Sequence, residues 1–573
     1  MSITSYRPAL LKGERPQPVD PMLRDPTAVQ AMGASSIEDY VCLDVIEPAK
    51  GRTNFAPHIA NASACGRLKL GYAIYPWVHF YPEWVEKEEG FTGYTNLADG
   101  TTCRQPSGWA PCTTRLVEHF YKIMGGRLGR YVDAVYVTDC AEYGELGYPL
   151  GYTKWLRQDD NAKLGWWCGD PYARGDFRQQ ALEQYKTVKQ INQSWGTSFA
   201  SEDQIAYPPI GLLKNNKDPR QLTPQQRRWI LDFVYWYQEA SPRRVKMFMK
   251  IAQAAFPKAA CEIKLGHGNE SAVMGHSYTS ACRILKGTPR LSIRSTHAAV
   301  SYFHVKRVAT PARFYGFRFL TEPPGTIKPE RMAERIFTDA CCGVSAYFDY
   351  TQNPAAAGEA FSKNIGLLDG RPAIVDVALL FPEADHYLRI QPGYPGGLLE
   401  VANAVRDVAD YDVVDERLIA DGALRNYAIL VIAGHPLIEE STWQALKQGL
   451  GGDHALHIIQ IAPDKQGPVP GEFTGVDGQV RTLPAGQQPG TIELVRDQPG
   501  GATAILAVQR AYAAVLAGRG LDRDTTNLLT DQDGVWAALF EHRILVYNGT
   551  DQEQASTGVK LAKGQILEIK RER

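Results

Sequence analysis

The sequence of 573 residues has almost no net charge, because 62 Lys and Arg residues balance 63 Asp and Glu residues. A chain without an excess of one sign lacks the field that attracts nucleic acid or an anionic membrane surface. The sequence also lacks an apolar run long enough to span a bilayer, and residues 1–24 have no apolar signal-peptide centre. We therefore expect a cytoplasmic protein that binds neither nucleic acid nor membrane.

Several chemical signatures are missing as well. The chain has no H-E-x-x-H motif, no phosphate-binding loop and no G-x-G-x-x-G motif placed where a helix begins. Its ten cysteines are irregularly spaced between Cys42 and Cys342, which in a reducing compartment indicates buried free thiols. We expect no cofactor, and the absence of cysteine after residue 342 predicts a catalytically silent C-terminal part that serves assembly.

The composition is that of a large globular protein, with 44% hydrophobic and 22% charged residues. A chain of this length exceeds what one hydrophobic core usually supports, so we expect two or three domains. Aromatic residues are plentiful, with 11 Trp and 28 Tyr. Flat apolar faces beside polar groups suit sugars, although packing in a large core explains most of these residues equally well. The expected partner is a neutral molecule.

Strand and helix patterns alternate through the first 370 residues. This alternation predicts a (β/α)8 TIM barrel over residues 1–370, although the sequence shows no signal for its first strand. The remaining seven strands are expected at residues 36–45, 68–77, 136–142, 261–265, 291–296, 314–320 and 343–350.

The pattern changes after residue 370. Uninterrupted apolar strands near residues 375–381, 411–414, 428–434 and 457–461 alternate with helices. Such strands predict a flavodoxin-like, doubly wound parallel α/β domain over residues 371–465. From 466 to 573 short β-like runs alternate with Gly and Pro, which predicts a small C-terminal β domain.

Two predicted barrel strands end in carboxylates. The apolar run from Tyr136 leads to Glu142 and then Glu145, and a second run ends at Glu322 before Pro323. Burial raises the pKa of a carboxyl group and so keeps it protonated for use as a general acid. Catalytic groups of (β/α)8 barrels lie at the carboxyl ends of the strands, and a carboxylate pair there indicates glycoside hydrolysis.

These motifs resemble those of the family 42 glycoside hydrolases, a family of β-galactosidases. Glu142-Tyr143-Gly144 is similar to the family's acid/base motif, and Thr321-Glu322-Pro323-Pro324-Gly325 is similar to its nucleophile motif. The resemblance implies a retaining, exo-acting β-glycosidase that hydrolyses small neutral oligosaccharides. Glu142 would protonate the glycosidic oxygen while Glu322 attacks the anomeric carbon. It also implies a homo-oligomer, with a trimer favoured.

The chain departs from the family in two places. Ala141 precedes Glu142 where the family has an Asn that contacts the sugar 2-hydroxyl, which indicates an altered sugar specificity. The segment from Gly144 to Pro149 is similar to the acid motif of β-amylases, which invert configuration, and makes Glu145 an alternative acid. Retention requires carboxyl groups only about 5 Å apart, which favours Glu142. A third hypothesis is a sugar-binding protein without turnover.

The same resemblance points to further residues that would contact the substrate. Arg115 stands where the family has a substrate-binding Arg, although a solvated helix cation is an equally good interpretation. Four cysteines match a zinc cluster of some family members but lack its close spacing, so we predict no metal site. Aromatic and histidine residues near strand ends are candidates for sugar contact, with core packing as the alternative: Trp77, His79, Trp109 and His297.

Overall fold

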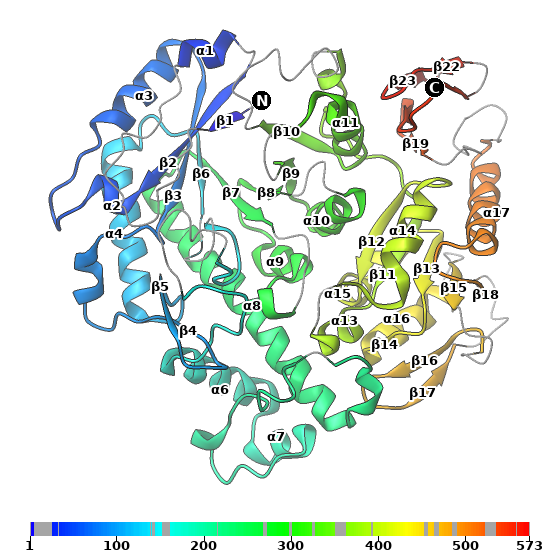
Figure 1. The fold of residues 1–573 in the computed structure, drawn as a ribbon, viewed down its shortest axis with the longest axis horizontal. Coiled ribbons are helices and arrows are strands. Elements are labelled where there is room, and N and C mark those ends of the chain that lie inside the picture. Colours follow the sequence, from blue (N-terminus) through cyan, green and yellow to red (C-terminus); the bar gives the residue numbers. More distant parts are fainter. Residues whose placement is uncertain are drawn as a thin grey trace.

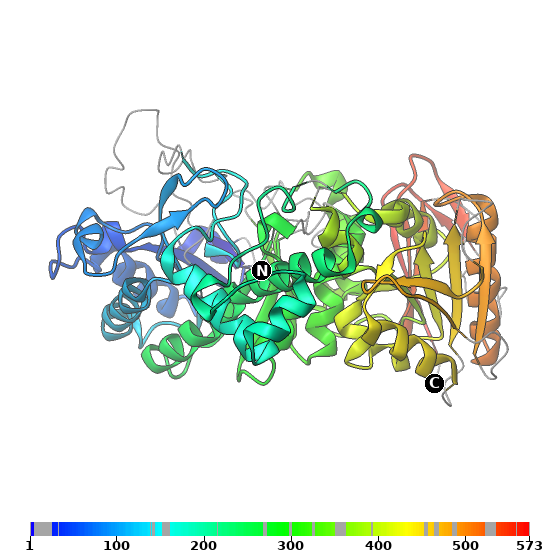
Figure 2. The same ribbon diagram turned by 90° about the horizontal axis from the view of Figure 1, so that it is seen from below.

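A closed eight-stranded barrel and a five-stranded α/β sheet lie side by side along the long axis of the molecule (Figures 1 and 2). The computed structural model describes residues 2–4, 26–31, 34–137, 139, 144–151, 161–214, 216–266, 272–296, 301–323, 327–349, 363–390, 393–451, 456–462, 469–483, 490–521, 534–556 and 559–571.

The barrel closes in the order β1-β10-β9-β8-β7-β6-β3-β2, with parallel pairing throughout. All seven predicted strands are present. The first strand, which could not be located from the sequence, is Ser2–Thr4. Three residues are too short to show a period, so only pairing with both neighbours defines this strand. The strands are β1 (Ser2–Thr4), β2 (Ser36–Cys42), β3 (Gly71–Trp77), β6 (Ala134–Tyr136), β7 (Ala260–Leu265), β8 (Leu291–Ser295), β9 (Arg318–Thr321) and β10 (Val344–Asp349).

The fourth barrel strand lies earlier than the predicted range of 136–142. Strand β6 ends at Tyr136, although the Val137 amide still donates to the carbonyl of Glu262 at 2.8 Å. Beyond the ladder, the Asp139 carboxylate accepts hydrogen bonds from Ser241 and Arg244 of helix α8 (Pro224–Ala255). Glu145, among the described residues, therefore lies beyond the strand and not within it.

Helices and short strands complete this part of the chain. Helix α8 is capped by Thr223 and Gln226, whose side chains each accept the other's backbone amide, and it contains Pro242. The helices are α1 (Pro26–Ala31), α2 (Leu43–Ile46), α3 (Ala56–Arg67), α4 (Pro111–Leu128), α6 (Pro171–Tyr185), α7 (Val188–Trp195), α8 (Pro224–Ala255), α9 (Tyr278–Leu285), α10 (Tyr302–Phe314) and α11 (Met332–Cys341), with the hairpin β4 (Gly93–Thr95) and β5 (Thr102–Pro106) beside them.

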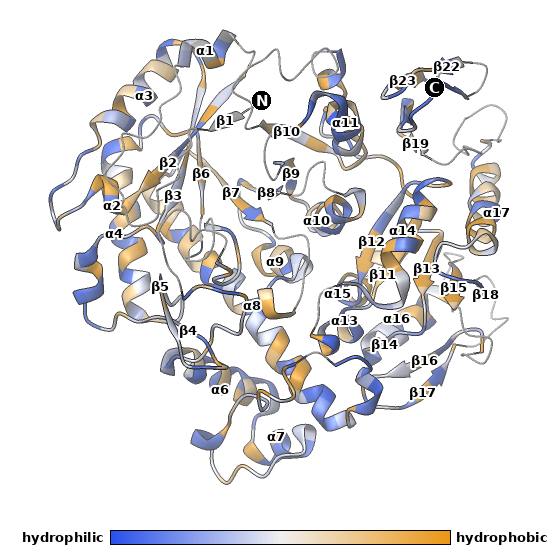
Figure 3. Cartoon of the chain, viewed as in Figure 1, coloured by the Kyte–Doolittle hydropathy of each residue, from blue (hydrophilic) through white to orange (hydrophobic). Residues whose placement is uncertain are grey.

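The second sheet has the strand order β12-β11-β13-β15-β18 with parallel pairing, which is the flavodoxin-like order. The strands β11, β13 and β15 at its centre are largely hydrophobic in Figure 3, as expected for strands covered on both faces. The strands are β11 (Val377–Phe381), β12 (Tyr411–Asp415), β13 (Ile429–Ala433), β15 (His457–Ala462) and β18 (Thr491–Arg496), and the helices are α13 (Glu383–Arg389), α14 (Leu398–Arg406), α15 (Glu416–Ala420), α16 (Glu440–Gly451) and α17 (Ala502–Gly518).

The segment expected to form a small β domain divides between two neighbours. Strand β18 and helix α17 extend the α/β sheet, because the apolar side of α17 packs on it through Val508 and Tyr512. Strands β19 and β20 pack on α11 through Phe540 and Tyr547. The small sheets are β14 (Leu437–Ile438) with β16 (Glu472–Gly475) and β17 (Val480–Thr482), β19 (Val535–Leu539) with β20 (Arg543–Asn548) and β23 (Ile566–Lys570), and β21 (Gln554–Ser556) with β22 (Val559–Leu561).

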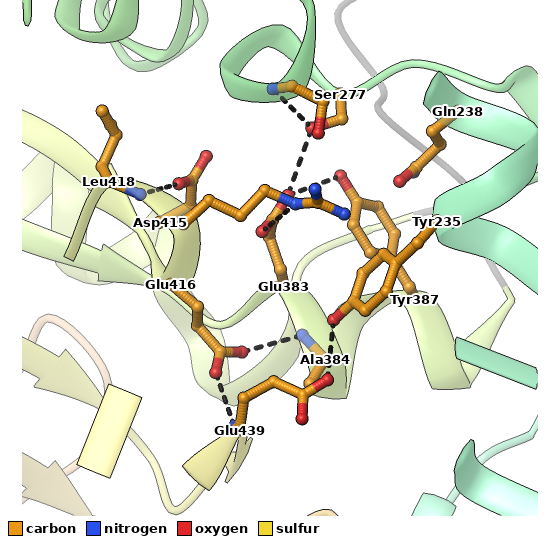
Figure 4. Close-up of polar contacts among 12 residues, drawn as sticks. Tyr235, Gln238, Ser277, Glu383, Ala384, Tyr387, Asp415, Glu416, Leu418 and Glu439 are labelled. Carbon is orange, nitrogen blue, oxygen red and sulfur yellow. Dashed lines mark hydrogen bonds and ion pairs between the residues drawn. The ribbon is translucent and has the colours of Figure 1, made fainter. Parts of the chain in front are cut away.

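A buried polar cluster joins the α/β sheet to the barrel helices (Figure 4). The Glu416 carboxylate accepts the backbone amides of Ala384 and Glu439 at 2.8 and 2.7 Å. Glu383 accepts a hydrogen bond from Ser277 of the barrel at 3.2 Å. Doubly wound sheets bind ligands at this edge of the strands. Here the Glu416 side chain of the same protein already occupies two of the backbone amides.

This cluster makes stability depend on pH. Burial raises the pKa of Glu416 to about 7, and burial with the charge of Asp415 raises the pKa of Glu383. The folded protein therefore keeps protons that the unfolded chain releases near pH 4.5, so the free energy of unfolding falls as pH rises. We expect a loss of about 1–2 kcal/mol per group between pH 6.5 and 8, measured by denaturant unfolding at each pH.

The matched variants are Glu383→Gln, which should flatten this dependence, and Glu568→Gln at an exposed position, which should not. The measurements begin at pH 6.5 because buried histidines have the opposite effect on the free energy of unfolding at lower pH. Burial lowers the pKa of His304, for example, to about 4. An equal slope for wild type and Glu383→Gln would contradict the prediction.

Candidate active site

Glu322 lies directly after β9 and is 3% exposed. Its amide donates to the carbonyl of Ser295 on β8 at 2.7 Å. The preceding Thr321 turns outward and donates from its hydroxyl to Asp339 of α11 at 2.8 Å. The backbone leading into Glu322 is therefore held in place, and its side chain meets Lys264 and Arg294 of neighbouring barrel strands.

Two cations meet the Glu322 carboxylate inside the barrel. Lys264 Nζ lies 2.9 Å and Arg294 Nη1 lies 3.3 Å from Glu322 Oε2. The same two groups contact Glu38, at 3.1 Å from Lys264 and 3.0 Å from Arg294, and Arg294 also contacts Glu262 at 2.8 Å. These five side chains, from β2, β7, β8 and the end of β9, are called the barrel charge network below.

Burial and neighbouring charges shift the pKa values of two members of this network. Burial, with the charge of Glu38, raises the pKa of Glu262 to about 8, so Glu262 is largely protonated. Burial alone would lower the pKa of Lys264, but the Glu322 and Glu38 carboxylates hold it well above its ordinary value. Lys264 and Arg294 thus each lie between the carboxyl groups of Glu38 and Glu322.

Aromatic rings surround the network. Lys264 Nζ lies 4.0 Å from the Tyr75 ring centre, and the Arg294 guanidinium lies 4.7 Å from that of Tyr136. Trp77 packs on Tyr40 with ring centres 4.6 Å apart and is 2% exposed. These rings separate the charges from water and strengthen the interactions between them.

Glu145 also lies at the carboxyl ends of barrel strands. It is 7% exposed, and its Oε2 packs so closely on Gly266, at the end of β7, that a Cβ there would be 2.0 Å away. Burial raises the pKa of Tyr75, Lys264 opposes the shift, and the charges of Glu145 and Glu322 add to it. The charges of Glu145 and Glu322 therefore both raise the pKa of the Tyr75 phenol.

The loop that carries Glu145 is anchored to helix α8. Arg244 Nη2 donates to Asp139 at 2.8 Å, and the Ser241 hydroxyl donates to the same carboxylate. The Tyr148 hydroxyl donates to the carbonyl of Tyr237 at 2.6 Å. Both ends of the loop are thus held by one rigid helix.

The other site residues predicted from the sequence lie in different surroundings. His79 is buried against Trp77, at 5.4 Å between ring centres, as a packing residue would be. Trp109 stacks on Tyr148 and contacts Arg244 beside the loop. Arg115 is exposed on α4 and donates to the carbonyl of Glu89, outside the barrel interior. Three residues named above lie outside the described residues: Ala141, Glu142 and His297.

Sequence reasoning missed four members of the barrel charge network: Glu38, Glu262, Lys264 and Arg294. A signal was present, because Glu262 and Lys264 alternate with apolar residues along β7, which Figure 3 also shows as mixed in hydropathy. A barrel strand is covered on both faces, so charges on alternate residues must point inward together.

The described part of the chain carries neither a metal-binding cluster nor a membrane-spanning helix. It holds no group of three or more His, Cys, Asp or Glu residues arranged to bind a metal ion. Cys103, Cys112 and Cys168 are buried free thiols, and Cys140 lies outside the described residues. Among the described helices, none has the length and apolarity needed to cross a membrane.

Comparisons with known proteins agree with this architecture, although no family model matches the chain. A β-galactosidase from Rahnella sp. R3 superimposes with a TM-score of 0.68 at 12% identity, covering 96% of this chain and 95% of that one. A family 42 exo-carrageenase from Bacteroides ovatus gives 0.63 at 10% identity, covering 100% and 82%. The chain has the fold of the family 42 glycoside hydrolases.

β-Amylases are a second group of relatives. The catalytic domain of a Paenibacillus polymyxa β-amylase gives a TM-score of 0.53 at 16% identity, covering 65% of this chain and 98% of that one. A thermophilic β-amylase from Thermoanaerobacterium thermosulfurigenes is 23% identical over 212 residues. That match spans 35% of each protein, so the chain covers about a third of the curated relative's length.

Proposed function

We propose that this chain is a glycoside hydrolase whose reaction centres on Glu322. The observation that carries the proposal is a buried carboxylate at the end of a barrel strand, paired with Lys264 and Arg294 at 2.9 and 3.3 Å. Such pairing favours the ionised form, which a nucleophile or a general base requires. The fold shared with β-galactosidases and a β-amylase supports the same chemistry.

The leading mechanism is retaining, on a neutral β-galactoside-like substrate cleaved from one end. Glu142 protonates the glycosidic oxygen as Glu322 attacks the anomeric carbon, which releases the leaving sugar and forms a glycosyl ester. Glu142 then takes a proton from water, and the resulting hydroxide equivalent cleaves the ester and regenerates Glu322. The proposal includes a cytoplasmic homo-oligomer, a trimer by preference, and a catalytic barrel domain at 1–370.

A second mechanism is inverting and uses Glu145. The position of Glu145 against Gly266 at the end of β7 favours it, as does the local similarity to β-amylases. Glu145 would then be the general acid, and Glu322 would remove a proton from the attacking water. The two mechanisms assign the same ionised state to Glu322 but opposite configurations to the product.

The product's first anomer tests the choice between them. A panel of aryl α- and β-glycosides identifies a substrate, and proton NMR within the first minutes of hydrolysis records the anomer before mutarotation. We expect retention of configuration. Inversion would assign the role of general acid to Glu145 instead of Glu142. A protein that binds sugars but hydrolyses no member of the panel would contradict the enzymatic proposal.

A further inference from the structure

We infer that Lys264 and Arg294 are positioning residues that hold the Glu322 carboxylate ionised and in one orientation. The inference deepens the proposed function, because it rests on the role of Glu322 there. Both cations contact the same oxygen, Oε2, and each also contacts Glu38. Two bridges to one fixed anion leave the Glu322 side chain little freedom to rotate.

The composition of the barrel interior supports a functional reason for these charges. Interiors of (β/α)8 barrels are ordinarily filled with layers of branched apolar side chains. A buried ion pair is often no more stabilising than apolar residues of the same volume, so stability alone does not account for a network of five ionisable groups. The need to keep Glu322 ionised does account for the network, because a buried carboxyl without cations would be protonated near neutral pH.

Several titratable groups face this carboxylate, and their charges decide the direction of the effect. The negative or neutral groups are carboxyls and phenols, and the only cations of the network are Lys264 and Arg294. Removal of Lys264 leaves Glu322 and Glu38 with one cation, so Glu322 should bind its proton more tightly. The facing groups are Glu38 on β2, Tyr75 on β3, Tyr136 on β6, Glu262 and Lys264 on β7, Arg294 on β8 and Glu145 in the loop after β6.

The test is the titration of Glu322 in Lys264→Met. Infrared difference spectra across pH, referenced to the Glu322→Gln variant, isolate the Glu322 carboxylate band without requiring activity. We expect its midpoint to rise by about 1 pH unit or more, since a nearby cation lowers a carboxyl pKa by 1–3 units. The acid limb of kcat/KM should move to higher pH by the same amount.

Two further variants separate this effect from a general loss of stability. Lys306→Met removes another buried Lys that bridges two carboxylates, Asp410 and Asp412, on the outer side of the barrel, and should leave the Glu322 midpoint unchanged. The double variant Glu38→Gln with Lys264→Met removes one charge of each sign and keeps the test available where the single variant does not fold. Its Glu322 midpoint is compared with that of Glu38→Gln alone, so that loss of Lys264 is the only change between the two proteins.

The outcomes distinguish the inference from the function it rests on. An unchanged Glu322 midpoint in both Lys264 variants would overturn the inference, whatever the activity. A raised midpoint in a protein that hydrolyses no glycoside would support the positioning role and contradict the proposed function. A raised midpoint with a matching shift of the kinetic acid limb is the expected result.

Discussion

Glu322→Gln should lower kcat by about four orders of magnitude or more, comparable to removal of a nucleophile in other hydrolases. The amide fills nearly the same volume as the carboxylate but cannot form a glycosyl ester or act as a base at neutral pH. Steady-state kinetics on the best aryl glycoside from the panel measures the loss. The effect is the largest expected because both proposed mechanisms require this one group.

The control for this variant must show that the fold survives. Lys264 and Arg294 lose a charged partner in Glu322→Gln but retain Glu38, so some loss of stability is expected without unfolding. Glu330→Gln, at an exposed position, changes the same functional group and should keep the wild-type rate. Wild-type kinetics in a well-folded Glu322→Gln protein would remove Glu322 from the mechanism.

The second largest effect is expected for Glu142→Ala. Loss of a general acid should slow hydrolysis of substrates with poor leaving groups by about 10²- to 10⁴-fold and spare aryl groups that leave without protonation. Azide should restore part of the rate, because a small anion enters the space left by the carboxylate and attacks the glycosyl ester. Rates on a series of aryl glycosides with different leaving-group pKa values measure this signature.

Glu145→Ala is the matched comparison, since Glu145 is the same residue type three positions after Glu142 in the sequence. We expect its kinetics to stay within about tenfold of wild type and to depend no more on the leaving group. Azide should have no effect on it. If Glu145→Ala instead shows the leaving-group dependence, Glu145 is the acid and inversion of configuration should accompany it.

The barrel illustrates what could be predicted locally. Seven of its strands follow from apolar runs and intervening helices, because a strand covered on both faces requires apolar residues along much of its length. Strand β1 could not be predicted from its three residues, and only its pairing with β2 and β10 defines it. Strand β18 likewise belongs to the α/β sheet because it pairs with β15.

The sequence by itself determined the architecture and the chemical class of the candidate site, because periodicity and strand-end carboxylates are local properties of the chain. Only the tertiary structure decided which charges surround Glu322. Lys264, Arg294 and Glu38 are 30 to 256 residues apart in the chain, and closure of the barrel brings the two cations within hydrogen-bonding distance of Glu38 and Glu322. Their effect on the carboxylate depends on distance and burial, which no local pattern encodes.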